Sequence, residues 1–139
     1  MRAVFCTCML LMTTLVLPGC PGGTPWGIPE PTKKPVKPED VIGKWQFNTS
    51  RGTVTLLFRP DGRFTQAVSA PKGVSSTTEG TWKLDSPNVA VEGYVSLATG
   101  KPEDMQWYMV DDGDKLALFG GDISDADWWV TMKRLPDSD

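Results

Sequence analysis

The chain has 139 residues, enough for one small domain, and its formal net charge is −3 at pH 7. Nucleic-acid-binding domains normally carry a basic face, so this charge balance argues against nucleic acid as a partner. The absence of histidine excludes catalytic triads that use histidine and the common histidine-ligated zinc centres. We therefore expect a protein that is not an enzyme and has no cofactor.

Residues 1–19 have the pattern of a secretory signal peptide. Arg2 supplies the positive charge at its start, and a mostly apolar stretch follows over residues 3–17. At about 1.5 Å per residue, this stretch is too short for a helix that crosses a bilayer core of about 30 Å. We expect a cleaved signal and not a transmembrane helix, and the stretch ends just before Cys20.

The sequence Leu17-Pro18-Gly19-Cys20 resembles the lipobox of bacterial lipoproteins, with Pro18 as its one departure from the pattern. The resemblance implies cleavage before Cys20 and acylation of this cysteine. Each buried CH₂ of an acyl chain contributes about 0.8 kcal/mol, so two or three chains would anchor the protein in a membrane of the cell envelope. In some lipoproteins, an Asp directly after the cysteine is associated with retention at the inner membrane. This chain has Pro21 at that position, so the resemblance favours the outer membrane. The alternative is an ordinary signal peptide with an incidental cysteine.

Residues 20–40 are expected to form the acylated N-terminus and a proline-rich linker. Six prolines fall within residues 21–38, and the segment has no apolar periodicity. Proline favours extended geometry in the residue before it, which predicts a semi-rigid spacer that reaches about 50 Å. The alternative is a proline-rich ligand for a partner, with Trp26 as its anchor.

The remaining domain is predicted to span 41–136, with a tail at 137–139. Short alternating segments bounded by turn residues such as Pro60-Asp61-Gly62 predict eight strands. These strands are expected at residues 44–49, 53–59, 63–69, 78–85, 89–96, 104–110, 115–119 and 128–135. Consecutive hairpins predict an all-β fold, an eight-stranded up-and-down antiparallel barrel, because closure removes the exposed sheet edges.

The alternation also predicts which side chains face the barrel interior. The large aromatic members of this set are Phe58, Phe64, Trp82, Trp107 and Trp128. They are expected to pack the core, and to line a cavity for a small apolar ligand if one is present. The same alternation places Gly93 and Val95 inward on their strand. Gly80 and Gly93 are the positions where space for a ligand would open.

Gly43-Lys44-Trp45 opens the first predicted strand, and Arg134 lies near the end of the last. This combination resembles the signature of the calycin superfamily, which includes lipocalins, fatty-acid-binding proteins and avidins. The resemblance covers residues 42–135 and implies a lipocalin-like barrel, closed at one end by Trp45 with Arg134 stacked on it. Such a cation–π contact contributes about 1–2 kcal/mol when partly desolvated. The strands are shorter than in a full lipocalin, which argues against a large cavity.

Two loops are rich in aspartate, at residues 111–114 and 122–127. Oxygen-rich loops can hold Ca²⁺, but neither loop has the spacing of an EF-hand. We therefore predict no metal site.

Several late strands are apolar on both faces, with Tyr108, Val110, Phe119 and Trp129 on the outward side. Either the linker covers this exterior, or it is a patch for another molecule. Two functions fit these observations. The first is a membrane-anchored, non-enzymatic binding module for a small apolar ligand. The alternative is a filled barrel that acts as a protein–protein interaction or structural module of the cell envelope.

Overall fold

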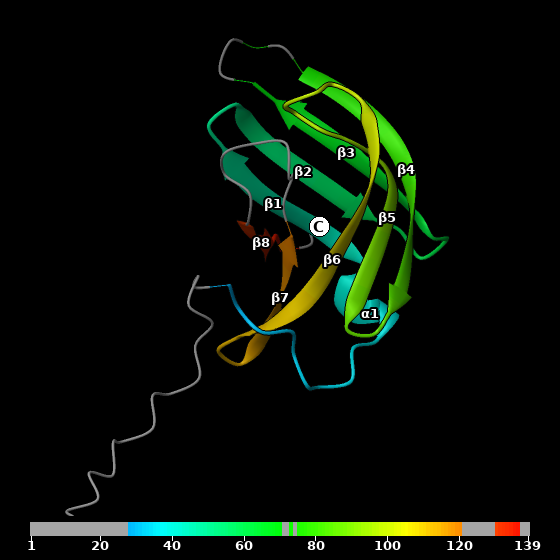
Figure 1. Cartoon of the computed structure of the whole chain (residues 1–139), viewed down its shortest axis with the longest axis vertical. Helices are drawn as coiled ribbons and strands as arrows, with labels where there is room; N and C mark the ends of the chain where they lie inside the picture. The colour runs from blue at the N-terminus through cyan, green and yellow to red at the C-terminus, as the bar shows by residue number, and fades with distance from the viewer. Residues whose placement is uncertain (1–27, 71–72, 74, 121–129, 137–139) are drawn as a thin grey trace, which may run out of the picture.

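The computed structural model describes residues 28–70, 73, 75–120 and 130–136. One short helix and eight strands follow each other in the order α1 (Pro38–Val41), β1 (Gly43–Thr49), β2 (Gly52–Phe58), β3 (Arg63–Ser69), β4 (Ser75–Asp85), β5 (Asn88–Val95), β6 (Pro102–Asp112), β7 (Lys115–Gly120) and β8 (Val130–Arg134). Each strand pairs antiparallel with the next, and β8 pairs with β1, so the sheet closes into an up-and-down barrel (Figure 1). The predicted eight-stranded antiparallel barrel is confirmed. Among the described residues, no helix has the length and apolar character needed to cross a bilayer.

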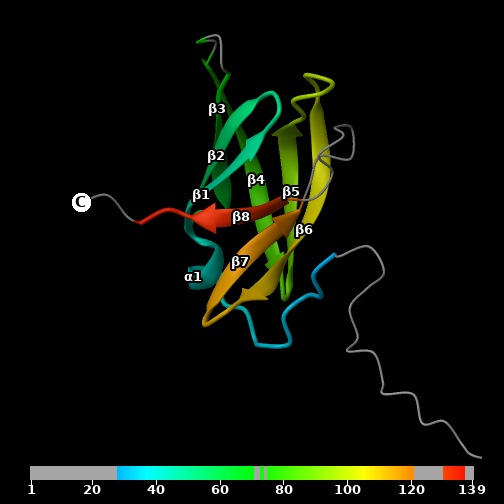
Figure 2. The same ribbon diagram turned by 90° about the vertical axis from the view of Figure 1, so that its left-hand side faces the viewer.

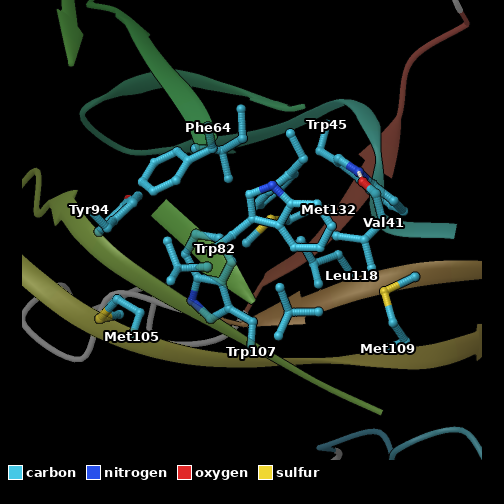
Figure 3. Packing of buried hydrophobic residues seen from close by; sticks show 14 of the residues in the cluster. Val41, Trp45, Phe64, Trp82, Tyr94, Met105, Trp107, Met109, Leu118 and Met132 are labelled. Atoms are coloured by element: carbon cyan, nitrogen blue, oxygen red, sulfur yellow. Dashed lines mark hydrogen bonds between the residues drawn. The ribbon is translucent and has the colours of Figure 1, made fainter. Parts of the chain in front are cut away.

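The core fills the space that the strands enclose, because side chains alternate between the interior and the exterior. β2 shows this most clearly, since Val54, Leu56 and Phe58 are at most 1% exposed. Leu57, between two of them, is 40% exposed. Burial of such apolar surface stabilises the fold by about 25 cal/mol per Å². Figure 3 shows the packed interior, with residues of α1 and of strands all around the barrel meeting one another.

A β-bulge in β5 changes the inward register that the alternation predicted. Two residues of β5, Glu92 and Gly93, stand opposite a single residue of β6, Asp104. Gly93 has a φ of +80°, a conformation that glycine adopts without strain. The extra residue brings Tyr94 into the interior, where it is 1% exposed, and leaves Val95 only partly buried. The predicted inward position of Val95 is therefore wrong.

Residues 28–37, predicted to belong to a free spacer, lie along one end of the barrel and lead into α1 (Figures 1 and 2). We call this segment the strap. The N–H of Thr32 donates a hydrogen bond to the carbonyl of Met109 at 2.8 Å. This edge of β6 is available because β5 begins only opposite Tyr108. The strap thus takes the place that a longer β5 would occupy, so residues 28–37 are not a free spacer.

The strap also covers the apolar exterior of β6 and β7. A second buried cluster, outside the barrel interior, consists of Val110, Ala117 and Phe119, with Ile28 and Tyr108 packed against it. Pro31 forms a β-bridge with Val110, and the hydroxyl of Tyr108 donates to the carbonyl of Pro29 at 3.2 Å. Burial raises the pKa of Tyr108. The strap therefore accounts for the apolar exterior at Tyr108, Val110 and Phe119. Trp26 and Trp129 lie outside the described residues.

Candidate functional site

One end of the barrel is closed by α1 together with the predicted pair Trp45 and Arg134. Trp45 is fully buried, and its Nε1 donates a hydrogen bond to the carbonyl of Val41 at 2.8 Å. Arg134 stands directly opposite Trp45 in the β1–β8 pairing. The guanidinium carbon lies 5.9 Å from the centroid of the Trp45 ring, within the range of a cation–π contact. The predicted contact between the two side chains is confirmed.

The guanidinium of Arg134 also binds the end of α1. Its Nη2 donates to the carbonyl of Ile42 at 2.6 Å, and its Nη1 lies 3.3 Å and 3.4 Å from the carbonyls of Glu39 and Asp40. Carbonyls at the end of a helix lack partners within the helix, so the cation satisfies them. A Cβ at Gly43, where φ is +132°, would lie 3.1 Å from the guanidinium nitrogens. The arrangement holds the barrel end together and offers no reacting group.

The aromatic residues predicted to line a ligand cavity are in contact with one another instead (Figure 3). Phe58 lies at the centre, with its ring centroid 5.6 Å from Trp82, 5.9 Å from Phe64 and 6.5 Å from Trp107. Tyr94, which the sequence analysis did not place inside, packs edge-on against Trp107 at 5.4 Å. Trp128 lies outside the described residues. The contacts make these side chains a packed core.

Two glycines show how tightly the rings fill the barrel. A Cβ on Gly80 would overlap the ring of Phe64, whose Cζ lies 2.6 Å from that position. A Cβ on Gly120 would overlap the indole of Trp107, whose Nε1 lies 2.7 Å from that position. The space that Gly80 was expected to open for a ligand is therefore occupied by an aromatic ring.

Two polar groups of the interior have opposite environments. Gln66 is 1% exposed, and its side-chain amide both donates to and accepts from the main chain of Val95, each at 2.8 Å. The β4–β5 pairing stops at Glu92, so Gln66 replaces the missing strand contact. By contrast, the buried Nε1 of Trp107 has no hydrogen-bond partner among the described residues. A buried donor of this kind normally finds an acceptor.

Three hollows that described residues line are found at the surface, and one of them reaches the rim of the aromatic core at Trp82. They lie between β1 and β8 (about 440 Å³), between the strap and the β6–β7 turn (about 450 Å³), and beside Trp82 on β4 and β5 (about 260 Å³). None of these three is lined by Phe58, Phe64 or Trp107. Trp82 reaches its hollow from the rim of the core, with its Nε1 donating to the carbonyl of Arg59 at 3.0 Å.

The aspartate-rich turn at 111–114 takes part in holding the strap. The Nζ of Lys34 lies 2.7 Å from Oδ1 of Asp111. This hydrogen bond from Lys34, helped by Thr32 and by the lysine charge, keeps the pKa of Asp111 below its usual value of 3.8. Among the described residues, no group of three or more acidic, cysteine or histidine side chains is placed to hold a metal ion. The second aspartate-rich loop, 122–127, lies outside them.

The sequence offered coverage of the barrel exterior by the linker as one alternative, but it did not indicate Thr32 or Val36 as contact residues. Thr32 and Val36 are 5% and 7% exposed, and the N–H of Val36 donates to Oγ of Ser86 at 3.1 Å. In the sequence, the only indication of these contacts is one hydroxyl and one apolar side chain, Thr32 and Val36, among prolines and lysines.

Comparison of the chain with family models, curated proteins and solved structures gave no match. The resemblances to bacterial lipoproteins and to calycins therefore rest on the sequence motifs alone.

Proposed function

We propose that this protein is a lipid-anchored, non-enzymatic module of the cell envelope, with a filled barrel that presents its exterior to a partner protein. The observation that carries this proposal is the packing of Phe64 over Gly80 and of Trp107 over Gly120. Rings that occupy these glycine positions fill the space that the two glycines would otherwise leave for a guest molecule. The interior then serves as a support, and binding belongs to the outer surface.

The anchor is the part of the proposal that the N-terminal sequence supports. An apolar segment that stops at Cys20 favours export and anchoring at a membrane. Cys20 would become the first residue of the mature chain. Pro21, which stands directly after Cys20 in place of an Asp, favours the outer membrane. Among the described residues, the part that packs on the barrel already includes Ile28.

The anchor is tested by growing the native host with a clickable palmitate analogue and comparing the wild-type chain with Cys20→Ser. We expect label on the wild-type protein and none on the variant. Cys6→Ser and Cys8→Ser provide the matched controls and should keep the label, because both residues precede the expected cleavage site. An exported wild-type protein without label would contradict the proposed anchor.

A small apolar ligand in the barrel, the first function expected from the sequence, is a second candidate. The unpartnered Nε1 of Trp107 favours it, because a ligand with one hydrogen-bond acceptor would satisfy this donor. Titration with a fluorescent fatty-acid analogue separates the two candidates. A filled barrel predicts no saturable binding. Saturable binding that weakens in Trp107→Phe, which keeps a ring but removes the N–H, would favour the ligand.

A further inference from the structure

The contact between β1 and β8 is short compared with the other strand pairs of the barrel. The positions that pair are Trp45 with Arg134 and Gln46 with Lys133. One further hydrogen bond joins the N–H of Leu135 to the carbonyl of Lys44 at 2.7 Å. On its other edge, β1 pairs with β2 along its whole length. Beyond Gln46 and Lys133, β1 and β8 therefore stay extended but no longer pair with each other. Figure 2 shows β8 between β7 and β1.

Among the described residues, this separation leaves two strand edges without a pairing strand. If the pairing continued, Asn48 would stand opposite Thr131, but residues 47–49 and 130–132 have no strand partner on the facing edges in the described part of the chain. Backbone N–H and C=O groups on a free edge are ready to pair with an added strand. We call these two edges, with the space between them, the seam.

The seam contains a hollow of about 440 Å³ with a distinct chemical character. Phe47 provides an apolar surface that is 8% exposed, and Asn48 and Thr131 provide neutral polar side chains. Lys133 is the charged residue among the described ones that line it. Lys44 is exposed two residues before Gln46, on the same outward side of β1. The described lining of the hollow thus carries one positive charge, that of Lys133, and Lys44 lies nearby, although the chain as a whole carries a net charge of −3.

We propose that the seam binds an extended peptide of a partner protein, which adds to the free edge of β1. An extended chain is the occupant that offers N–H and C=O groups at the spacing of a strand. Its side chains alternate, so apolar residues face Phe47 while acidic residues face outward beside Lys133 and Lys44. The inference names the partner class of the proposed exterior surface, and it rests on that proposed function.

The test uses the ¹⁵N-labelled full chain in detergent and three synthetic peptides. The probe is an acetylated pentapeptide of alternating Glu and Val. The first control replaces each Glu by Lys, and the second carries N-methyl groups on the amides of one edge. We expect the probe to protect the amide N–H groups of Asn48 and Thr131 from exchange. Loss of about two hydrogen bonds should weaken the N-methylated peptide about tenfold.

Protein variants test the charge preference. Lys133→Glu should weaken the Glu–Val probe and favour the Lys–Val peptide, because it reverses the charge beside the hollow. Lys83→Glu, an exposed lysine on β4, is the matched control and should leave both affinities unchanged. Equal binding of the Glu–Val, Lys–Val and N-methylated peptides, or protection elsewhere on the barrel, would overturn the proposal. A bound small molecule or a missing acyl group would instead contradict the proposed function, so the two failures are distinguishable.

Discussion

The guanidinium of Arg134 lies over the indole of Trp45 while it donates hydrogen bonds to the carbonyls that end α1. One side chain thereby joins the last strand, the first strand and the helix before it. Trp45 and Arg134 are also paired with each other in the β1–β8 ladder, next to the pair Gln46 and Lys133. Arg134 therefore stabilises the closure of the barrel more than its exposed position suggests.

Replacing Arg134 by Ala should lower the free energy of unfolding by about 1–2 kcal/mol, because the ring contact and the carbonyl contacts are lost together. Arg134→Lys should recover only part of this, since an ammonium lacks the planar fork of donors. Lys133→Ala, at the neighbouring outward position, is the control, with an expected change below about 0.5 kcal/mol. Urea unfolding measures all three. Equal effects of Arg134→Ala and Lys133→Ala would contradict this account.

Gly120→Ala should destabilise the protein by about 1–3 kcal/mol, because the new methyl group overlaps the indole of Trp107. Trp107→Leu removes the overlapping atoms, so the same glycine substitution should cost less in that background. A double-mutant cycle by urea unfolding measures this coupling. Additive effects would mean that the ring does not occupy the space over Gly120.

Val36→Ala should weaken the docking of the strap and lower the free energy of unfolding by about 1–2 kcal/mol, because the Val36 side chain is buried. Lys33→Ala, on the exposed side of the strap, should have little effect. Amide exchange of Thr32 reports on the strap itself, since its N–H is bonded to Met109. Faster exchange of Thr32 is expected in Val36→Ala only. Unchanged protection would contradict a docked strap.

Acid should loosen the strap through Asp111. Its pKa is lowered in the folded state, so its contribution to stability is present above its ordinary value of 3.8 and is lost as the pH falls through the lowered value. The contribution is small, because the Lys34–Asp111 pair is exposed. The midpoint temperature of thermal unfolding should be lower for Asp111→Asn than for the wild type near neutral pH, and the two temperatures should converge in acid. Asp112→Asn is the control. A difference that persists in acid would contradict this assignment.

The barrel could be predicted from the sequence because turns and alternation are local. Pro60-Asp61-Gly62 fixes a hairpin by its own chemistry, and the spacing of Val54, Leu56 and Phe58 fixes the inward face. The contact of Trp45 with Arg134 could be predicted from a motif at the two ends of the barrel.

The strap, the bulge and the end of the β1–β8 pairing depend on which strand edges meet. The sequence of a single segment does not reveal this. Proline indicates an extended chain, but not that Thr32 will pair with the free edge of β6. The bulge at Gly93 shifts one residue, and this was enough to place Tyr94 inside in place of Val95. The early end of the β1–β8 pairing leaves no mark in the alternation of either strand.

Native mass spectrometry of the acylated full chain, released from detergent, tests the filled barrel most directly. The account predicts the mass of the mature protein with its acyl chains and nothing else bound. An additional small molecule on the wild-type protein, absent from Trp107→Phe and retained by the exterior variant Lys83→Ala, would contradict a filled interior and show the barrel to be a carrier.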